Sequence, residues 1–160
     1  MDAHEFNQIV DLYSDALYRF CLKNASDPDM ANDLVQDAFE KLWKNRNSVD
    51  PAKVKSYLFT VAYHKFVDEY RRKQKNVSWD DKTAEPSHTR QYSDLKEILD
   101  KAIDRLPAIQ KNVLLLRDWE GYSYKEIGEI TGLSESQVKV YIFRARKFLR
   151  QVIGSIETVL

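Results

Sequence analysis

The chain is poor in cysteine and has no long apolar run. Cys21 is the only cysteine among 160 residues, which excludes an internal disulfide and gives no sign of an oxidising compartment. It falls between Phe20 and Leu22 in an apolar helical pattern, so we expect a buried, unreactive thiol. No apolar run reaches membrane-spanning length, and the first residues lack the apolar core of a signal peptide. The sequence predicts a cytoplasmic protein without membrane insertion.

Glycine, proline and net charge are also low. Only four glycines and four prolines interrupt a sequence rich in helix-forming residues, which favours an all-α fold. The net charge is zero, so no overall basicity points to nucleic acid. The charge is nevertheless uneven, because residues 105–160 hold nine basic and six acidic side chains while residues 76–104 hold four and seven. The basic excess therefore lies at the C-terminal end.

The apolar pattern divides the chain into two helical parts. Apolar residues recur at helical spacing before residue 75 and again from residue 93 onward. Residues 76–92 have no helical period and contain Pro86 with several serines and threonines. We therefore predict two small helical domains, residues 1–75 and 93–160, joined by a flexible linker at 76–92. The tail at residues 153–160 is expected to be frayed or weakly docked.

Residues 122–150 have the pattern of a helix-turn-helix. Gly132 can adopt the left-handed conformation that ends a helix, and a second helix follows after a short turn. Each helix start has a capping box, in which a hydroxyl and a longer polar side chain satisfy free N–H groups. The two boxes are Ser123 with Glu126 and Ser134 with Gln137.

The second of these helices has two unlike faces. Val138, Ile142, Ala145 and Leu149 form an apolar stripe that we expect to be buried. From residue 134 to residue 151 there are five basic side chains against one acid. A basic, partly aromatic exposed face suits the major groove of DNA, although basic residues also favour the last turn of an ordinary solvated helix. The exposed face is expected to carry Ser136, Lys139, Val140, Phe143, Arg144 and Lys147.

The first part of the chain offers two polar surfaces. The helix expected at 30–44 has a polar face that includes Asp33, Gln36, Asp37 and Glu40. The helix expected at 52–73 ends in a run of basic residues at 71–75, which complements its dipole. With Tyr57, Tyr63, His64 and Lys65 this run forms an aromatic and basic pattern typical of single-stranded nucleic-acid binding, although the aromatic rings also suit a core.

Three segments in order resemble a known family. The segments 33–43, 56–72 and 106–127 are similar to the polymerase-binding helix, the promoter-melting segment and the start of the second domain of extracytoplasmic-function sigma factors of bacterial RNA polymerase. The resemblance covers about residues 5–152. It implies a transcription initiation factor with core RNA polymerase, promoter DNA and an anti-sigma factor as partners, and it requires no catalytic residue, metal or cofactor.

The resemblance assigns candidate residues to three surfaces. Core polymerase is expected at Asp33, Gln36, Asp37 and Glu40. Minus-ten DNA is expected at Tyr57, Val61, Tyr63, His64, Lys65, Asp68, Arg71 and Arg72, with the loop 45–53 beside it. Minus-thirty-five DNA is expected at Ser136, Gln137, Lys139, Val140, Tyr141, Phe143, Arg144 and Lys147. Val140 and Tyr141 depart from the family's usual residues, so the promoter sequence does not follow from the resemblance.

Two other classes of protein fit parts of the pattern. A conventional helix-turn-helix regulator, with N-terminal helices that sense a ligand or dimerise, would bind duplex DNA without polymerase. An enzyme could use His64 and Asp68, four residues apart, as metal ligands, but this pair lacks the further ligands that a metal site needs. The clustered carboxylates at 27–37 lack the glycine and closing glutamate of a calcium loop, so helix capping explains them better.

Overall fold

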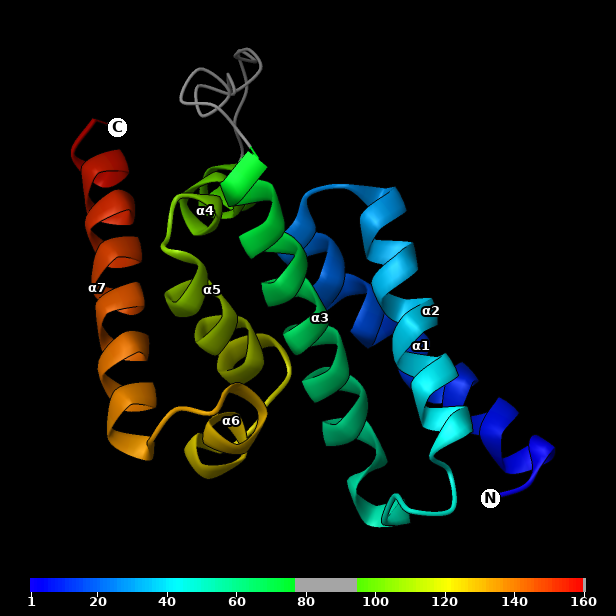
Figure 1. Cartoon of the computed structure of the whole chain (residues 1–160). Helices are drawn as coiled ribbons and strands as arrows, with labels where there is room; N and C mark the ends of the chain where they lie inside the picture. The colour runs from blue at the N-terminus through cyan, green and yellow to red at the C-terminus, as the bar shows by residue number, and fades with distance from the viewer. Residues whose placement is uncertain (77–94, 160) are drawn as a thin grey trace.

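The computed structural model describes residues 1–76 and 95–159, and all of its regular structure in these ranges is helical. Apart from Asn76, the predicted linker lies outside the described residues. Figure 1 shows the helices, which are α1 (Ala3–Ala25), α2 (Pro28–Lys44), a 3₁₀ turn (Pro51–Lys53), α3 (Val54–Asn76), α4 (Leu95–Asp104), α5 (Ala108–Leu114), a π-helical turn (Leu115–Trp119), α6 (Tyr124–Thr131) and α7 (Glu135–Val159).

Local sequence explains where the first helices begin. The Asp2 carboxylate accepts a hydrogen bond from the Glu5 amide at 2.8 Å, and the Glu5 carboxylate accepts one from the Asp2 amide at 3.0 Å. The start of α2 is capped by Asp27, which accepts from the Asp29 amide, and Pro28 occupies the first helical position. The predicted helices are therefore confirmed, with ends that shift by a few residues.

The first half of the molecule is a bundle of α1, α2 and α3. Its core is formed by apolar side chains of the three helices, with Leu17, Phe20, Leu34, Leu42, Leu58 and Phe59 at most 2% exposed. Rings extend this core toward the start of α1, where Phe6 meets Trp43 edge-on at 5.0 Å between centroids. Packing of these side chains holds the three helices together.

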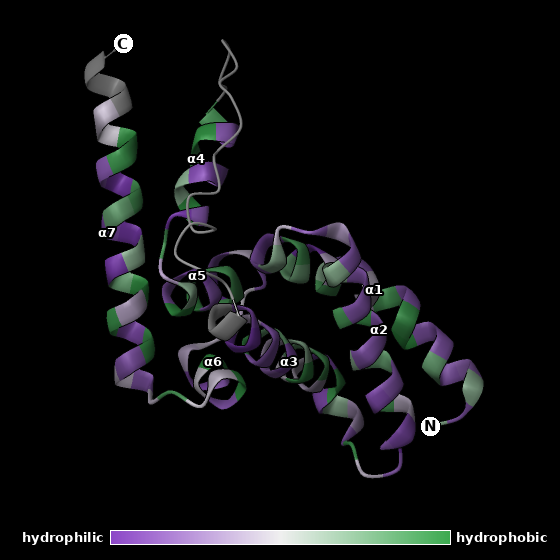
Figure 2. Cartoon of the chain, turned by 45° about the horizontal axis from the view of Figure 1, so that its top comes forward, coloured by the Kyte–Doolittle hydropathy of each residue, from purple (hydrophilic) through white to green (hydrophobic). Residues whose placement is uncertain are grey.

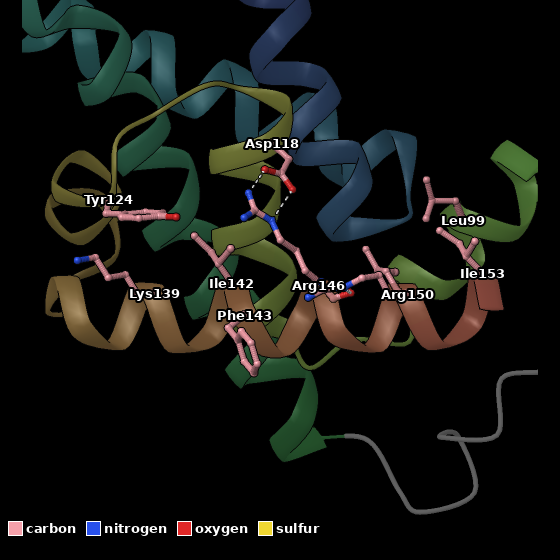
Figure 3. Close-up of a pocket in the computed structure, with 10 residues that line it drawn as sticks. Leu99, Asp118, Tyr124, Lys139, Ile142, Phe143, Arg146, Arg150 and Ile153 are labelled. Atoms are coloured by element: carbon pink, nitrogen blue, oxygen red, sulfur yellow. Dashed lines mark hydrogen bonds and ion pairs between the residues drawn. The ribbon is translucent and has the colours of Figure 1, made fainter. Parts of the chain in front are cut away.

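The second half places α7 against α4, α5 and α6. The predicted stripe on α7 is confirmed, since Val138, Ile142, Ala145 and Leu149 are at most 9% exposed. The expectation of a frayed tail differs from the structure, because α7 continues without a break as far as Val159. The residues from 153 onward continue α7 in sequence. Ile153 and Leu149 line one pocket beside α7, which Figure 3 shows.

The two halves pack against each other. Helix α3 lies in the middle of the molecule, with α1 and α2 on one side and α5 and α6 on the other (Figure 1), and Figure 2 shows the same order from a second direction. The Phe59 ring of α3 meets the Tyr122 ring edge-on, with centroids 5.7 Å apart. One cluster of buried side chains runs from Leu17 of α1 to Ile142 of α7. The halves therefore share a continuous core.

The single cysteine lies in this core. Cys21 is 2% exposed, and burial raises the pKa of its thiol to about 12. Because thiolate is the reactive form, the prediction of an inert thiol agrees with this environment. Within residues 1–76 and 95–159, none of the helices is both long and apolar enough to cross a membrane.

A glycine inside α6 allows the helix-turn-helix to close tightly. A Cβ added at Gly128 would lie 2.7 Å from the backbone oxygen of Leu133 in the turn, whereas one added at Gly154 of α7 would meet nothing within 4 Å. The backbone of the turn therefore approaches α6 more closely than any side chain permits.

We expect Gly128→Ala to destabilise the protein by about 1–3 kcal/mol, because the turn must move to relieve the clash. Gly154→Ala is the matched control, and its gain in helix propensity should stabilise the protein by up to about 1 kcal/mol. Chemical denaturation of the two variants measures both effects. Equal stabilisation by both substitutions would contradict the close approach.

Candidate nucleic-acid interface

The helix-turn-helix has the predicted local geometry. Ser123 and Glu126 form a complete capping box at the start of α6, with hydrogen bonds of 2.9 and 3.1 Å. Ser134 and Gln137 form the same reciprocal pair before α7, again at 2.9 and 3.1 Å. Gly132 between them has φ +81°, the left-handed conformation that ends α6. The sequence of the turn therefore sets the angle at which α7 leaves α6.

The exposed side of the first turns of α7 is called the recognition face here. Its members are exposed side chains from successive helical turns: Ser136, Gln137, Lys139, Val140, Phe143, Arg144 and Lys147. Phe143 is 61% exposed and Val140 is 44% exposed, although both are apolar. Tyr141, the remaining predicted contact, is only half-exposed and packs against the core. Three cations and two apolar side chains thus share one solvent-facing surface.

Neighbouring groups orient the cations of α7. The Lys139 ammonium lies over the Tyr124 ring at 5.7 Å, and the Arg144 guanidinium lies 5.9 Å from the Tyr141 ring. Arg146 instead turns inward and forms a two-pronged ion pair with Asp118, which raises the pKa of Arg146 (Figure 3). Figure 3 also shows Phe143 pointing away from this pair. Arg146 therefore ties α7 to the π-helical turn, and the exposed cations remain available for phosphates or bases.

A second surface lies between α2 and α3. It is a groove of ≈ 790 Å³, called the α2–α3 groove here, and it combines residues predicted for polymerase binding with residues predicted for minus-ten DNA. The predicted members that line it are Asp37 and Glu40 from α2 and Tyr57, Val61, His64, Lys65 and Asp68 from α3. Packing of the two helices brings together side chains that are up to 31 residues apart in sequence, from Asp37 to Asp68.

Charges of both signs alternate along the α2–α3 groove. The Lys65 ammonium lies 3.6 Å from the Asp37 carboxylate, which links α3 to α2. Lys44 pairs with Glu40 one turn away at 3.5 Å. Both pairs are largely solvent-exposed, so each adds little to stability and can exchange its partner for a ligand. At one end of the groove Asn45 donates a hydrogen bond to the Tyr57 hydroxyl at 3.2 Å.

The remaining predicted polymerase-binding residues line an adjoining hollow. Asp33 and Gln36 are exposed there, and Asp37 and Lys65 belong to both the hollow and the α2–α3 groove. Asp27 and Asp29 border the same hollow, and Asp27 caps the start of α2 by accepting a hydrogen bond from the Asp29 amide, as expected of a capping carboxylate. The polar face of α2 is therefore a continuous exposed strip that borders the nucleic-acid candidates on α3.

Two predicted minus-ten residues lie on the opposite side of α3. Tyr63 is 7% exposed, which differs from the expected exposed ring, and burial raises the pKa of its hydroxyl. With Arg71 it lines a cavity of ≈ 490 Å³ against Ile109 and Asn112 of α5. Successive residues of a helix point about 100° apart, so Tyr63 turns away from its neighbour His64, which faces the α2–α3 groove. Arg72 is exposed and pairs with Glu69 at 3.3 Å.

The sequence interpretation missed several residues that belong to the α2–α3 groove. Lys41, Lys44 and Thr60 line it beside the predicted members, together with Asn45 from the loop 45–53 that was expected beside them. Lys41 lies four residues after Asp37 and Lys44 lies four after Glu40, and this helical spacing is a signal that could have identified them. Next to the groove, the Arg46 guanidinium stacks on the Trp43 ring at 3.8 Å.

Among the described residues, no group of three or more His, Cys, Asp or Glu side chains gathers in a geometry suited to a metal ion. His64 and Asp68 do lie in the same groove, four residues apart on α3. Lys65 lies beside them on the wall of that groove.

Comparisons with known proteins agree with this architecture. Residues 9–76 match the family model described as Sigma-70 region 2, and residues 96–149 match Sigma-70, region 4. The chain is 32% identical over 153 residues to the ECF RNA polymerase sigma factor SigM of Bacillus subtilis (strain 168), covering 90% of this chain and 92% of that protein. It is 28% identical to SigW of the same organism, over 94% of this chain and 89% of SigW.

A solved structure shows the same arrangement of helices. The sigma factor RpoE of Bartonella quintana, crystallised with the anti-sigma factor NepR, aligns with a TM-score of 0.79 at 30% identity, over 94% of this chain and 97% of that chain. The two family models match the two halves of the fold in chain order, and the relatives match over nearly their whole length. This chain therefore belongs to the extracytoplasmic-function sigma factors of bacterial RNA polymerase.

Proposed function

We propose that this protein binds core RNA polymerase and directs it to specific promoters. The observation that carries the proposal is the presence of two unlike surfaces on the two halves of one sigma-family chain. The recognition face on α7 is exposed, basic and partly apolar, and the α2–α3 groove is concave and mixed in charge. A duplex and a single strand require different surfaces of these two kinds. The protein acts in the cytoplasm, where polymerase and promoters are found.

The second half recognises the minus-thirty-five duplex. Lys139 and Arg144 are exposed and can donate hydrogen bonds to guanine acceptors or to phosphates. Val140 and Phe143 offer apolar contact, for instance to a thymine methyl group. Lys147 lies one turn farther along α7 and is better placed for a phosphate. The recognition face thus combines base readout with backbone contact.

The first half binds polymerase and captures unpaired minus-ten bases. The strip formed by Asp33, Gln36, Asp37 and Glu40 is acidic and exposed, so a basic surface of polymerase complements it. The adjacent groove offers His64 and Tyr57 to bases and Lys65 to phosphates. Unstacking of bases costs a few kcal/mol, which stacking on such rings offsets. Polymerase and the open strand therefore occupy neighbouring parts of one half.

An anti-sigma factor is a further expected partner. Solved relatives of this fold include a sigma factor bound to an anti-sigma factor. A conventional helix-turn-helix regulator is the alternative, but it would not need the acidic strip on α2, and the match to both sigma regions disfavours it.

Reconstitution with purified core RNA polymerase tests the proposed function. We expect this protein to direct transcription from a defined set of start sites that core polymerase alone does not use, and sequencing of the transcripts identifies those sites. Duplex binding without any polymerase-dependent start sites would favour the conventional regulator instead.

The acidic strip on α2 gives a second prediction. Asp37→Arg should weaken binding to core polymerase at least tenfold, which corresponds to about 1.4 kcal/mol. The new cation faces a basic partner, and it also faces Lys65 in place of the ion pair now present. Asp11→Arg, an exposed reversal on α1, is the control. If Asp37→Arg remains folded and binds polymerase as tightly as the control, the strip is an ordinary solvated face.

The recognition face gives a third prediction. Arg144→Ala should cost about 1–3 kcal/mol of minus-thirty-five binding and relax the preference at one base position. Lys147→Ala should weaken binding evenly across sequences and reduce the dependence on salt. Selection from a randomised duplex library, with the full chain, measures both effects. Unchanged selected sequences for Arg144→Ala would make that side chain a phosphate contact.

A further inference from the structure

The ring of Tyr124 connects α6 to the recognition face. Tyr124 is the first residue of α6 and directly follows Ser123, so the capping box fixes its backbone. Its side chain is half-buried and packs against the core. The Lys139 ammonium, near the start of α7, lies over the Tyr124 ring at 5.7 Å from its centroid (Figure 3). An aromatic side chain of one helix therefore holds a cation of the other.

The Tyr124 ring has further partners that restrict its own position. The Arg117 guanidinium of the π-helical turn lies 4.6 Å from the ring centroid, and it donates a hydrogen bond to the Tyr122 carbonyl at 2.9 Å. Arg146 of α7 lines the same pocket as Tyr124. The hydrogen bond with Asp118 is the main reason why the pKa of Arg146 is raised, and Tyr124 acts in the same direction. The ring is thus a fixed platform beside α7.

Such a platform changes what Lys139 can do. A lysine in water samples many rotamers, whereas a hydrogen bond to one base atom requires a single geometry. Attraction between the ammonium and the electron-rich face of the ring favours the rotamers in which Lys139 lies over Tyr124. An ammonium has three N–H donors, so contact with the ring leaves donors for a base. Less entropy is lost on binding when the bound rotamer is already favoured.

The second basic side chain at the groove-facing positions is held differently. The Arg144 guanidinium lies 5.9 Å from the ring of Tyr141, which is three residues earlier on the same helix. That contact moves with α7 as a unit. The contact of Lys139 with Tyr124 instead joins two helices, so a substitution on α6 alters the recognition face on α7.

We propose that Tyr124 is a positioning residue for minus-thirty-five recognition, which holds the Lys139 ammonium where it donates to the O6 and N7 atoms of a guanine. The proposal rests on the proposed function for its DNA target and on the contact of Lys139 with Tyr124 for its structure. Guanine is the base whose major-groove edge presents two adjacent acceptors, and lysine or arginine is its usual partner. A side chain outside the recognition face therefore sets the preference at one base pair.

Binding selection with the assembled holoenzyme tests this role. The protein with core RNA polymerase is bound to promoter duplexes that are randomised at minus-thirty-five, and the bound duplexes are sequenced. We expect Tyr124→Leu to lose the guanine preference at the same position as Lys139→Ala, with binding weakened about two- to fivefold, the range that a cation–π contact supports. Tyr124→Phe keeps the ring and should restore the guanine preference.

A double variant separates positioning from a structural role. In the Lys139→Ala background, Tyr124→Leu should weaken binding no further, because the ring then has no ammonium to hold. If Tyr124→Leu weakens binding equally with and without Lys139, the ring only supports the fold and the proposal is overturned. A loss of preference in Tyr124→Phe as large as that in Tyr124→Leu would likewise overturn the role of the ring.

Proton NMR of the protein without DNA tests the contact itself. Ring currents shift protons that lie over an aromatic face, so the Cε protons of Lys139 should be shifted upfield in the wild-type protein and in Tyr124→Phe. The shift should disappear in Tyr124→Leu. The Cε protons of Lys147, farther along α7, are the internal control and should resonate at the same position in all three proteins. Identical Lys139 shifts in the three proteins would mean that the ammonium does not stay over the ring.

Failure of the positioning role differs from failure of the proposed function. A minus-thirty-five preference that Tyr124→Leu leaves unchanged would overturn the positioning role alone. A wild-type holoenzyme that selects no sequence at minus-thirty-five would overturn the proposed function, and with it the guanine target.

Discussion

The edge-on contact of Tyr122 with Phe59 is the interaction on which the arrangement of this molecule depends. Phe59 belongs to the core of the first half, where its ring lies 5.2 Å from Phe20. Tyr122 immediately precedes the capped start of α6, so its position sets where the helix-turn-helix begins. The Tyr122 ring therefore connects the core of α1–α3 to the helix-turn-helix that carries the recognition face. The orientation of α7 follows from this contact.

Helix α3 is used on two sides. One side, with His64 and Lys65, forms the wall of the α2–α3 groove, and the other, with Tyr63, Phe66 and Arg71, packs against α5. A helix buried on both sides would normally be apolar all round, but α3 keeps charged residues toward the groove. This division lets a single helix hold a core together and present the candidate nucleic-acid surface of the α2–α3 groove. It also explains why consecutive residues of α3 have opposite exposures.

The two candidate surfaces differ in how firmly they are built. The recognition face is fixed by two capping boxes, the left-handed Gly132 and the close approach at Gly128, all within a short stretch of sequence. The walls of the α2–α3 groove instead carry exposed ion pairs, one of which joins the two helices, and such pairs are weak and exchangeable. A rigid face suits a duplex of fixed shape, whereas an adaptable groove suits a strand whose bases must be unstacked.

The sequence by itself determined the helices, the buried stripe of α7, the capping boxes around Ser123 and Ser134, and the exposed recognition face. These features depend on spacings of three and four residues, which a linear pattern contains. It also indicated the family, through three segments in order. Only the tertiary structure decided that Tyr63 is buried, that Arg146 turns to Asp118, and that Lys41 and Lys44 join the α2–α3 groove. It alone decided that the halves share a core through Tyr122 and the Arg19–Glu120 pair. Arg146 and Asp118 are 28 residues apart in sequence, and Arg19 and Glu120 are 101 residues apart. A local sequence period does not specify which distant side chain will fill a given space.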